Sequence, residues 1–179
     1  MNKTVIEERV VYQKTARTTE EVTGLLDGLD LGPIKFKLMD AEEGEGWNRG
    51  KVEEMEKQYK RFLLLTVTSG HAIIPTKEID AFWHQHILDT QKYADDCERC
   101  FGFFLHHFPY IGLRGEDDRQ NLEALFQQTR QIYEAMFGES YGVSAQDCEN
   151  CGNCSASCGV GDCDTPQRVR PTVEPLAVC

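Results

Sequence analysis

The stretch PTKEIDAFWHQHILDTQKYADDCERCFGFFLHHF, residues 75–108, decides the fold. On a helical wheel with 100° per residue, the apolar side chains in the first half of this stretch and His86 lie on one arc. We predict a helix from Lys77 to about Leu88, with Thr76 as its N-cap. Asp89 or Thr90 then caps a second helix, whose inward face carries Tyr93, Cys97, Cys100, Phe101 and Phe104.

Outward from this stretch, further apolar patterns at helical spacing extend the same architecture. A short helix begins at Thr18 or Thr19 and ends at Gly32 and Pro33, and residues 40–47 form an acidic loop. A longer helix starts near Val52 and stops before Gly70, and the last one ends at Gly138. No strand pattern is present, so residues 1–142 are predicted to be a mainly α, compact domain of about five or six helices.

The composition changes beyond Gly142. Residues 143–179 are rich in Cys, Gly, Ser, Asp and Pro, and they show no helical period. We predict a flexible Cys-rich tail that is disordered without metal and forms no second folded domain.

Charge and hydropathy exclude several classes of function. The chain has 19 basic and 30 acidic side chains and a net charge of −11, which argues against nucleic acid binding. No apolar run is long enough for a membrane span, and residues 1–13 lack the apolar core of a secretory signal. We expect an acidic cytoplasmic protein with reduced cysteines, which bind metal more often than they form disulfides.

Four side chains on the two central helices have the chemistry of zinc ligands. His86, Cys97 and Cys100 project inward, and His107 joins them if the second helix persists that far; His106 then points away. The alternative is that all four are ordinary core residues, since Cys and His are often buried for packing alone. His84 lies about 160° from His86 on the helix, close to Asp80, so the two histidines do not share one ion.

The same stretch resembles the bacterial branch of the glycine-rich domain-containing protein-like family. The resemblance covers roughly residues 29–141. It rests on Asp80, Trp83, His84, His86, Leu88, Asp89, Tyr93, Asp96 and Cys97, and on residues 105–109. Plant members of the family carry this module ahead of glycine-rich sequence and are associated with development and stress responses. The resemblance implies that these polar residues form a unit, and it implies no reaction.

The tail holds a second set of cysteines. Cys148, Cys151, Cys154 and Cys158 follow the spacing C-x2-C-x2-C-x3-C, with Cys163 and Cys179 beyond. This spacing resembles a ferredoxin cluster-binding run, although glycine stands where that run has proline. Dense thiolates indicate binding of zinc, copper(I) or an iron–sulfur cluster by the first five cysteines. Alternatives are thiol redox exchange, a modified peptide for which the helical domain is the leader, and a tail with no fixed role.

We therefore predict a non-enzymatic metal-binding or metal-handling protein that uses His and Cys ligands. The first alternative is an enzyme in which Cys97 is nucleophile or ligand and His84, oriented by Asp80, is the base. The second is an interaction module with a protein partner, expected if Asp80, Trp83 and His86 are tied up in a closed hydrogen-bonded core.

Overall fold

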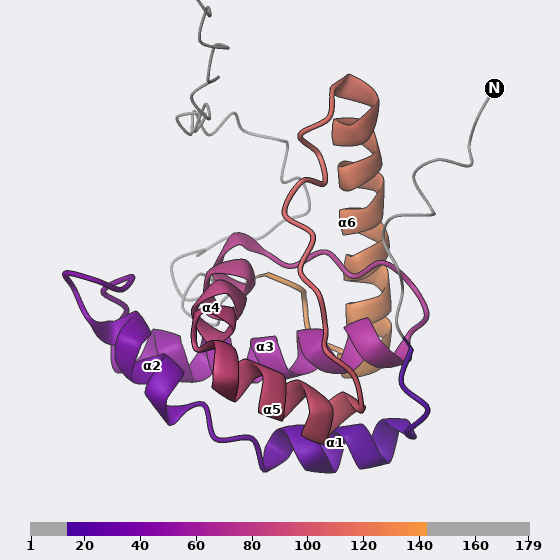
Figure 1. Ribbon diagram of the computed structural model, residues 1–179. Coiled ribbons are helices and arrows are strands. Elements are labelled where there is room, and N and C mark those ends of the chain that lie inside the picture. The colour runs from indigo at the N-terminus through magenta and orange to yellow at the C-terminus, as the bar shows by residue number, and fades with distance from the viewer. Residues whose placement is uncertain (1–13, 143–179) are drawn as a thin grey trace, which may run out of the picture. The chain divides into compact units, whose positions relative to one another are not determined.

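A computed structural model of the chain describes residues 14–142, and this part contains six helices and no strand. The helices are α1 (Thr19–Asp27), α2 (Gly32–Met39), α3 (Arg49–Thr68), α4 (Lys77–Leu88), α5 (Thr90–Phe101) and α6 (Glu116–Phe137) (Figure 1). The predicted mainly α fold is confirmed. The predictions for the N-terminal signal and for the tail cysteines concern residues 1–13 and 143–179, which lie outside the described residues.

Side-chain caps fix where several helices begin. Thr18 and Glu21 form a reciprocal capping box at α1, in which each side chain accepts a hydrogen bond from the other residue's backbone N–H. Thr76 accepts from the N–H of Ile79 at the start of α4, and Asp89 accepts from Lys92 at the start of α5. These caps stand where the sequence predicts them, because capping depends only on residues within one turn.

Helix α3 lies at the centre of the core. It packs against α1, α2 and α4, while α5 packs against α1 and α4. Its buried side chains include Tyr59, Phe62, Leu63 and Leu65, and these meet Phe82 and Trp83 of α4 in one apolar cluster. Helices α2, α3 and α5 all pack against α4 and so fix the helix that carries Asp80, His84 and His86.

Helix α6 is attached differently from the other five helices and stands upright beside them in Figure 1. The buried hydroxyl of Thr129 accepts a hydrogen bond from the N–H of Ile74 at 3.0 Å. Tyr141, just after the helix, donates to the carbonyl of Ile74, and Arg61 of α3 donates to the hydroxyl of Tyr133. These polar contacts with residues 70–76 and α3 therefore supplement the apolar packing of Tyr133 and Tyr141 in the core.

Helix α5 ends at Gly102, which has the left-handed backbone conformation, with φ 79°. The chain then leaves the helix axis and runs as an irregular segment, residues 103–115, to α6. The sequence prediction that His107 returns to the Cys97 face requires the helix to continue, and it does not.

Candidate metal site

The residues of the recognisable motif divide into two polar groups that lie on different sides of α4. The first is buried and surrounds His86, whose side chain is 2% exposed. Its Nδ1 lies 3.0 Å from the hydroxyl of Tyr59, and its Nε2 lies 3.0 Å from Oδ2 of Asp96. A neutral ring that accepts from the tyrosine and donates to the carboxylate satisfies both contacts.

The buried carboxylate of Asp96 is also paired with cations. Lys92 lies 2.9 Å from its Oδ2 and Arg99 lies 2.8 Å from its Oδ1. Burial lowers the pKa of His86, while Asp96 opposes this shift. Every buried side-chain polar atom among residues 14–142 has a hydrogen-bond partner. Both ring nitrogens of His86 are thus used by protein groups, and neither is free to bind a metal.

The two helical cysteines are buried free thiols. Cys97 and Cys100 are 1% and 0% exposed, and burial raises the pKa of each thiol. The raised pKa disfavours the thiolate that both nucleophilic catalysis and metal binding require. These environments agree with the packing alternative of the sequence analysis for Cys97 and Cys100.

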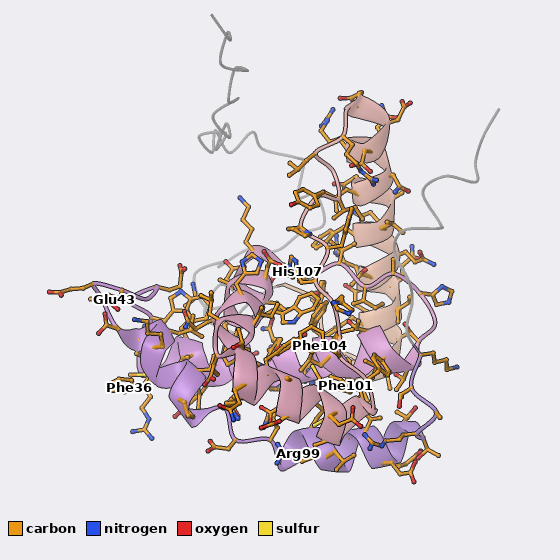
Figure 2. All side chains as sticks on the ribbon, viewed as in Figure 1. Phe36, Glu43, Arg99, Phe101, Phe104 and His107 are labelled. Atoms are coloured by element: carbon orange, nitrogen blue, oxygen red, sulfur yellow. The ribbon has the colours of Figure 1, made fainter. Side chains whose placement is uncertain are left out.

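The second polar group joins Asp80 and His84 of α4 to His107 of the 103–115 segment. Figure 2 shows His107 close to α4. Nε2 of His107 lies 2.9 Å from Oδ1 of Asp80 and 3.2 Å from Nε2 of His84. Nε2 of His84 lies 3.7 Å from Oδ2 of Asp80. Among residues 14–142 this is the one group of three or more His, Cys, Asp or Glu side chains with ligand atoms this close.

The structure does not bring together the four predicted ligands His86, Cys97, Cys100 and His107. His107 meets Asp80 and His84 instead, because the chain turns away from the α5 axis at Gly102. The spacing of Asp80 and His84, four residues apart on a helix, indicates that these two side chains are neighbours. No signal in the sequence places His107 beside them, since an irregular segment has no period from which to extrapolate.

The buried motif residues hold His107 in place. Trp83 donates from Nε1 to the hydroxyl of Tyr93, which in turn donates to the carbonyl of Leu105 at 2.6 Å. The Cys97 thiol also contacts the backbone of Leu105. The ring of Trp83 then packs on the ring of His107, with 4.5 Å between centroids. Residues outside the group of Asp80, His84 and His107 thus fix the chain two residues before His107 and cover one face of its ring.

The contacts of His107 converge on one ring nitrogen. Its Nε2 carries at most one hydrogen, and two partners within 3.2 Å of this atom share it as a three-centre hydrogen bond. Without that hydrogen, the lone pair of the nitrogen faces the carboxylate of Asp80. A cation in place of the shared hydrogen accepts a lone pair from each of the three side chains.

The distances also fit coordination geometry. Zinc–nitrogen bonds of about 2.0–2.1 Å in a tetrahedron separate neighbouring ligand atoms by about 3.3–3.4 Å. The two nitrogens lie 3.2 Å apart, and each faces a different oxygen of Asp80, at 2.9 Å for His107 and 3.7 Å for His84, so the distances lie on both sides of this value. Two imidazoles and one carboxylate are a common donor set for zinc and for non-haem iron(II).

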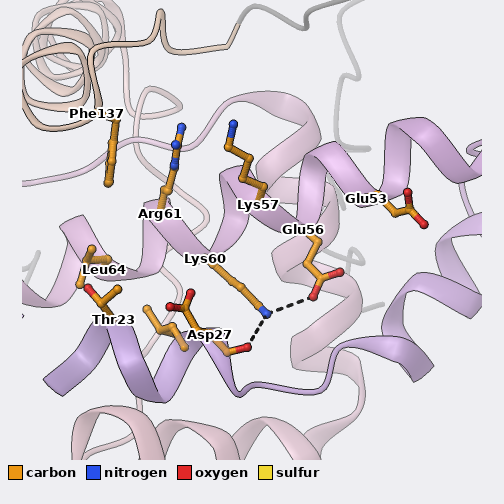
Figure 3. A pocket seen from close by; sticks show the side chains of 10 residues that line it. Thr23, Asp27, Glu53, Glu56, Lys57, Lys60, Arg61, Leu64 and Phe137 are labelled. Carbon is orange, nitrogen blue, oxygen red and sulfur yellow. Dashed lines mark hydrogen bonds and ion pairs between the residues drawn. The ribbon is translucent and has the colours of Figure 1, made fainter. Parts of the chain in front are cut away.

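A separate groove of about 450 Å³ between α1 and α3 contains several charged side chains (Figure 3). Its cations are already neutralised by neighbours. Lys60 pairs with Glu56 at 3.1 Å, and both Lys57 and Arg61 pair with Glu139. Arg61 lowers the pKa of Glu139 to about 2. The groove therefore offers no unpaired cation for a ligand, in contrast to the group around His107.

Comparison with known proteins places the site in a family. The UCP032817-like family matches residues 34–132, which is more than half of the chain. The chain belongs to this family. The match includes α3, α4 and α5 and all three residues of the candidate metal site.

One curated relative supports the resemblance seen in the sequence of this UCP032817-like protein. Glycine-rich domain-containing protein 1 of Arabidopsis thaliana is 30% identical over 95 residues, which are 50% of this chain and 11% of the plant protein. The shared region is thus a small part of the relative. No solved structure matches the chain. None of the six helices described is long and apolar enough to cross a membrane.

Proposed function

We propose that this UCP032817-like protein binds a divalent metal ion, zinc in the first place, through Asp80, His84 and His107. The observation that carries the proposal is the convergence of Asp80 and His84 on Nε2 of His107, with ligand atoms 2.9 and 3.2 Å from it. Metal binding of this kind is the non-enzymatic function that the sequence analysis favours, with a different set of ligands in the helical domain.

The two alternatives, an enzyme with Cys97 as nucleophile and an interaction module, explain fewer of the observed contacts. A nucleophilic Cys97 is disfavoured by its burial and by the raised pKa of its thiol. A pure interaction module predicts that Asp80, Trp83 and His86 lie in one closed core. Trp83 and His86 do so, whereas the side chain of Asp80 is 35% exposed and faces two histidines.

The ligands and their supports have separate roles in the proposal. The three ligands contribute one negative charge, and Trp83 and Tyr93 act as positioning residues that orient His107. Outer-shell partners of this type typically change metal affinity by about 10–100-fold, and loss of a ligand costs more. In a metal site, loss of a ligand should therefore weaken zinc binding more than loss of Trp83 or Tyr93. A cluster held by hydrogen bonds alone does not predict this order of zinc affinities.

The test uses the full chain in which six tail cysteines are replaced by serine, so that tail thiolates do not compete for zinc. In this tail-serine variant the changed residues are Cys148, Cys151, Cys154, Cys158, Cys163 and Cys179. The metal-free protein is titrated against a chromophoric zinc chelator. We expect one equivalent of zinc to bind, and His107→Ala to weaken binding by more than about 100-fold.

His106→Ala is the matched control, because His106 is the exposed neighbour of His107 and belongs to no ligand group among residues 14–142. It should bind zinc as the parent does. Circular dichroism of both variants verifies that the helices are retained. Absence of zinc binding by the parent, or equal binding by His107→Ala, contradicts the proposal.

A further inference from the structure

The three candidate ligands occupy one side of the space that a metal ion would fill. One ligand atom from each residue lies within 4.8 Å of the other two, so together they provide a single face of a coordination polyhedron. A tetrahedral ion then has one further position and an octahedral ion has three, all on the opposite side. What fills that side decides whether the site is closed and structural or open to exchange.

Within the described part of the chain, no further side chain of the usual ligand types fills that opposite side. No fourth His, Cys, Asp or Glu from residues 14–142 joins the group. The side chains of His84 and Asp80 are 52% and 35% exposed, whereas that of His107 is 14% exposed. His107 is covered by Trp83, so the solvent-facing part of the group is the side of His84 and Asp80.

The net charge of the metal-loaded site favours one kind of additional ligand. A divalent ion with one carboxylate and two neutral imidazoles keeps a net charge of about +1. An anionic oxygen donor neutralises this charge and replaces a metal-bound water. A hydroxamate or carboxylate has the required charge and can use one or two oxygens as the ion expands from four to five ligands.

We infer that the metal site is open and takes a small organic oxygen-donor anion directly on the ion. This inference rests on the proposed function and extends it, because a protein can bind zinc at Asp80, His84 and His107 while a further protein group closes the coordination sphere. The open position makes the site capable of binding an exogenous carboxylate or hydroxamate, which a structural zinc site does not do.

Cobalt(II) in place of zinc reports on both steps separately. The metal-free tail-serine variant is titrated with Co²⁺, and the visible absorption bands show whether the ion enters the site. Acetohydroxamate is then added to the cobalt-loaded protein, with the neutral acetamide as the matched control ligand. We expect acetohydroxamate to change the intensity and position of the bands saturably, at a concentration at least about tenfold below any effect of acetamide.

The possible results separate the two proposals. Cobalt bands that appear in the parent and in His106→Ala, and not in His107→Ala, support the site itself. If these bands then stay unchanged throughout the acetohydroxamate titration, the coordination sphere is closed and the inference of an open site is overturned while metal binding stands. If no cobalt bands appear, the proposed function itself is contradicted. A response to acetamide equal to that of acetohydroxamate overturns the anion preference.

Discussion

At the scale of single residues, the histidine in the buried group, His86, and the histidine in the half-exposed group, His107, make different polar contacts. His86 has a protein partner at each ring nitrogen, with Tyr59 and Asp96 both at 3.0 Å. His107 has two partners at one nitrogen. Each ring nitrogen of His86 has one partner to itself, whereas two partners share one nitrogen of His107. This convergence on one nitrogen is what makes His107, and not His86, the candidate ligand.

The burial of His86 makes a specific prediction about pH. Its pKa in the folded protein is lowered, chiefly by desolvation, so below its ordinary pKa of about 6.5 the unfolded state binds more protons than the folded state. Stability should therefore fall as the pH decreases from about 7.5 to 5.5. One such group contributes at most about 1.4 kcal/mol per pH unit.

His86→Gln tests this prediction, because glutamine retains a donor for Asp96 and an acceptor for Tyr59 but does not titrate. Urea unfolding is measured across this pH range with a metal chelator present. We expect the variant to be less stable at pH 7.5 and to lose less stability on acidification. The other four histidines are present in both proteins, so equal pH slopes would show that His86 does not contribute.

At the scale of elements, the helices that carry the site are predictable from local signals. Thr18, Thr76 and Asp89 cap α1, α4 and α5 as their sequence positions indicate, and Gly138 ends α6 with φ 68°. Each of these features depends on interactions within one or two turns. Their success explains why the neighbouring positions of Asp80 and His84 are also predicted correctly.

The start of α2 and the path of the chain after α5 are not predicted by these local signals. Gly32 and Pro33 predict the end of a helix, yet they form the first turn of α2. Proline suits both places, because the first turn of a helix needs no backbone N–H from it. His107 lies beyond the end of α5, where direction depends on tertiary contacts. Tyr93 and Trp83 supply these contacts by binding Leu105 and covering the His107 ring.

The attachment of α6 provides a prediction at this scale. Thr129→Val keeps the shape of a fully buried side chain but removes the acceptor for the N–H of Ile74. An unpaired buried N–H costs about 1–3 kcal/mol, and the N–H of Ile74 is part-buried, so the free energy of unfolding should fall by about 1 kcal/mol, the lower end of this range. Thr68→Val in α3 is the control, because the Thr68 hydroxyl bonds only within its own helix, to Leu64. Equal effects of the two changes would contradict the assigned role of Thr129.

At the scale of the whole molecule, the eight cysteines form two sets with different surroundings. Cys97 and Cys100 are buried in α5, and the other six lie in residues 143–179, outside the described part of the chain. Within residues 14–142, no cysteine joins the candidate site. We therefore expect metal held by tail thiolates, as their spacing predicts, to be independent of metal held by Asp80, His84 and His107.

Metal counting on the full chain tests this independence. We expect the reduced natural sequence to bind more than one equivalent of zinc, the tail-serine variant to bind one, and the tail-serine variant with His107→Ala to bind none. Cys97→Ala and Cys100→Ala should leave each count unchanged, although each leaves a small cavity that costs about 1 kcal/mol of stability. Elemental analysis after gel filtration gives the counts, and urea unfolding confirms that each variant is folded. A lower count on removal of Cys97 or Cys100 from a folded protein would instead restore the buried cysteines as ligands. A count of one in the natural sequence would show that the tail cysteines do not hold zinc.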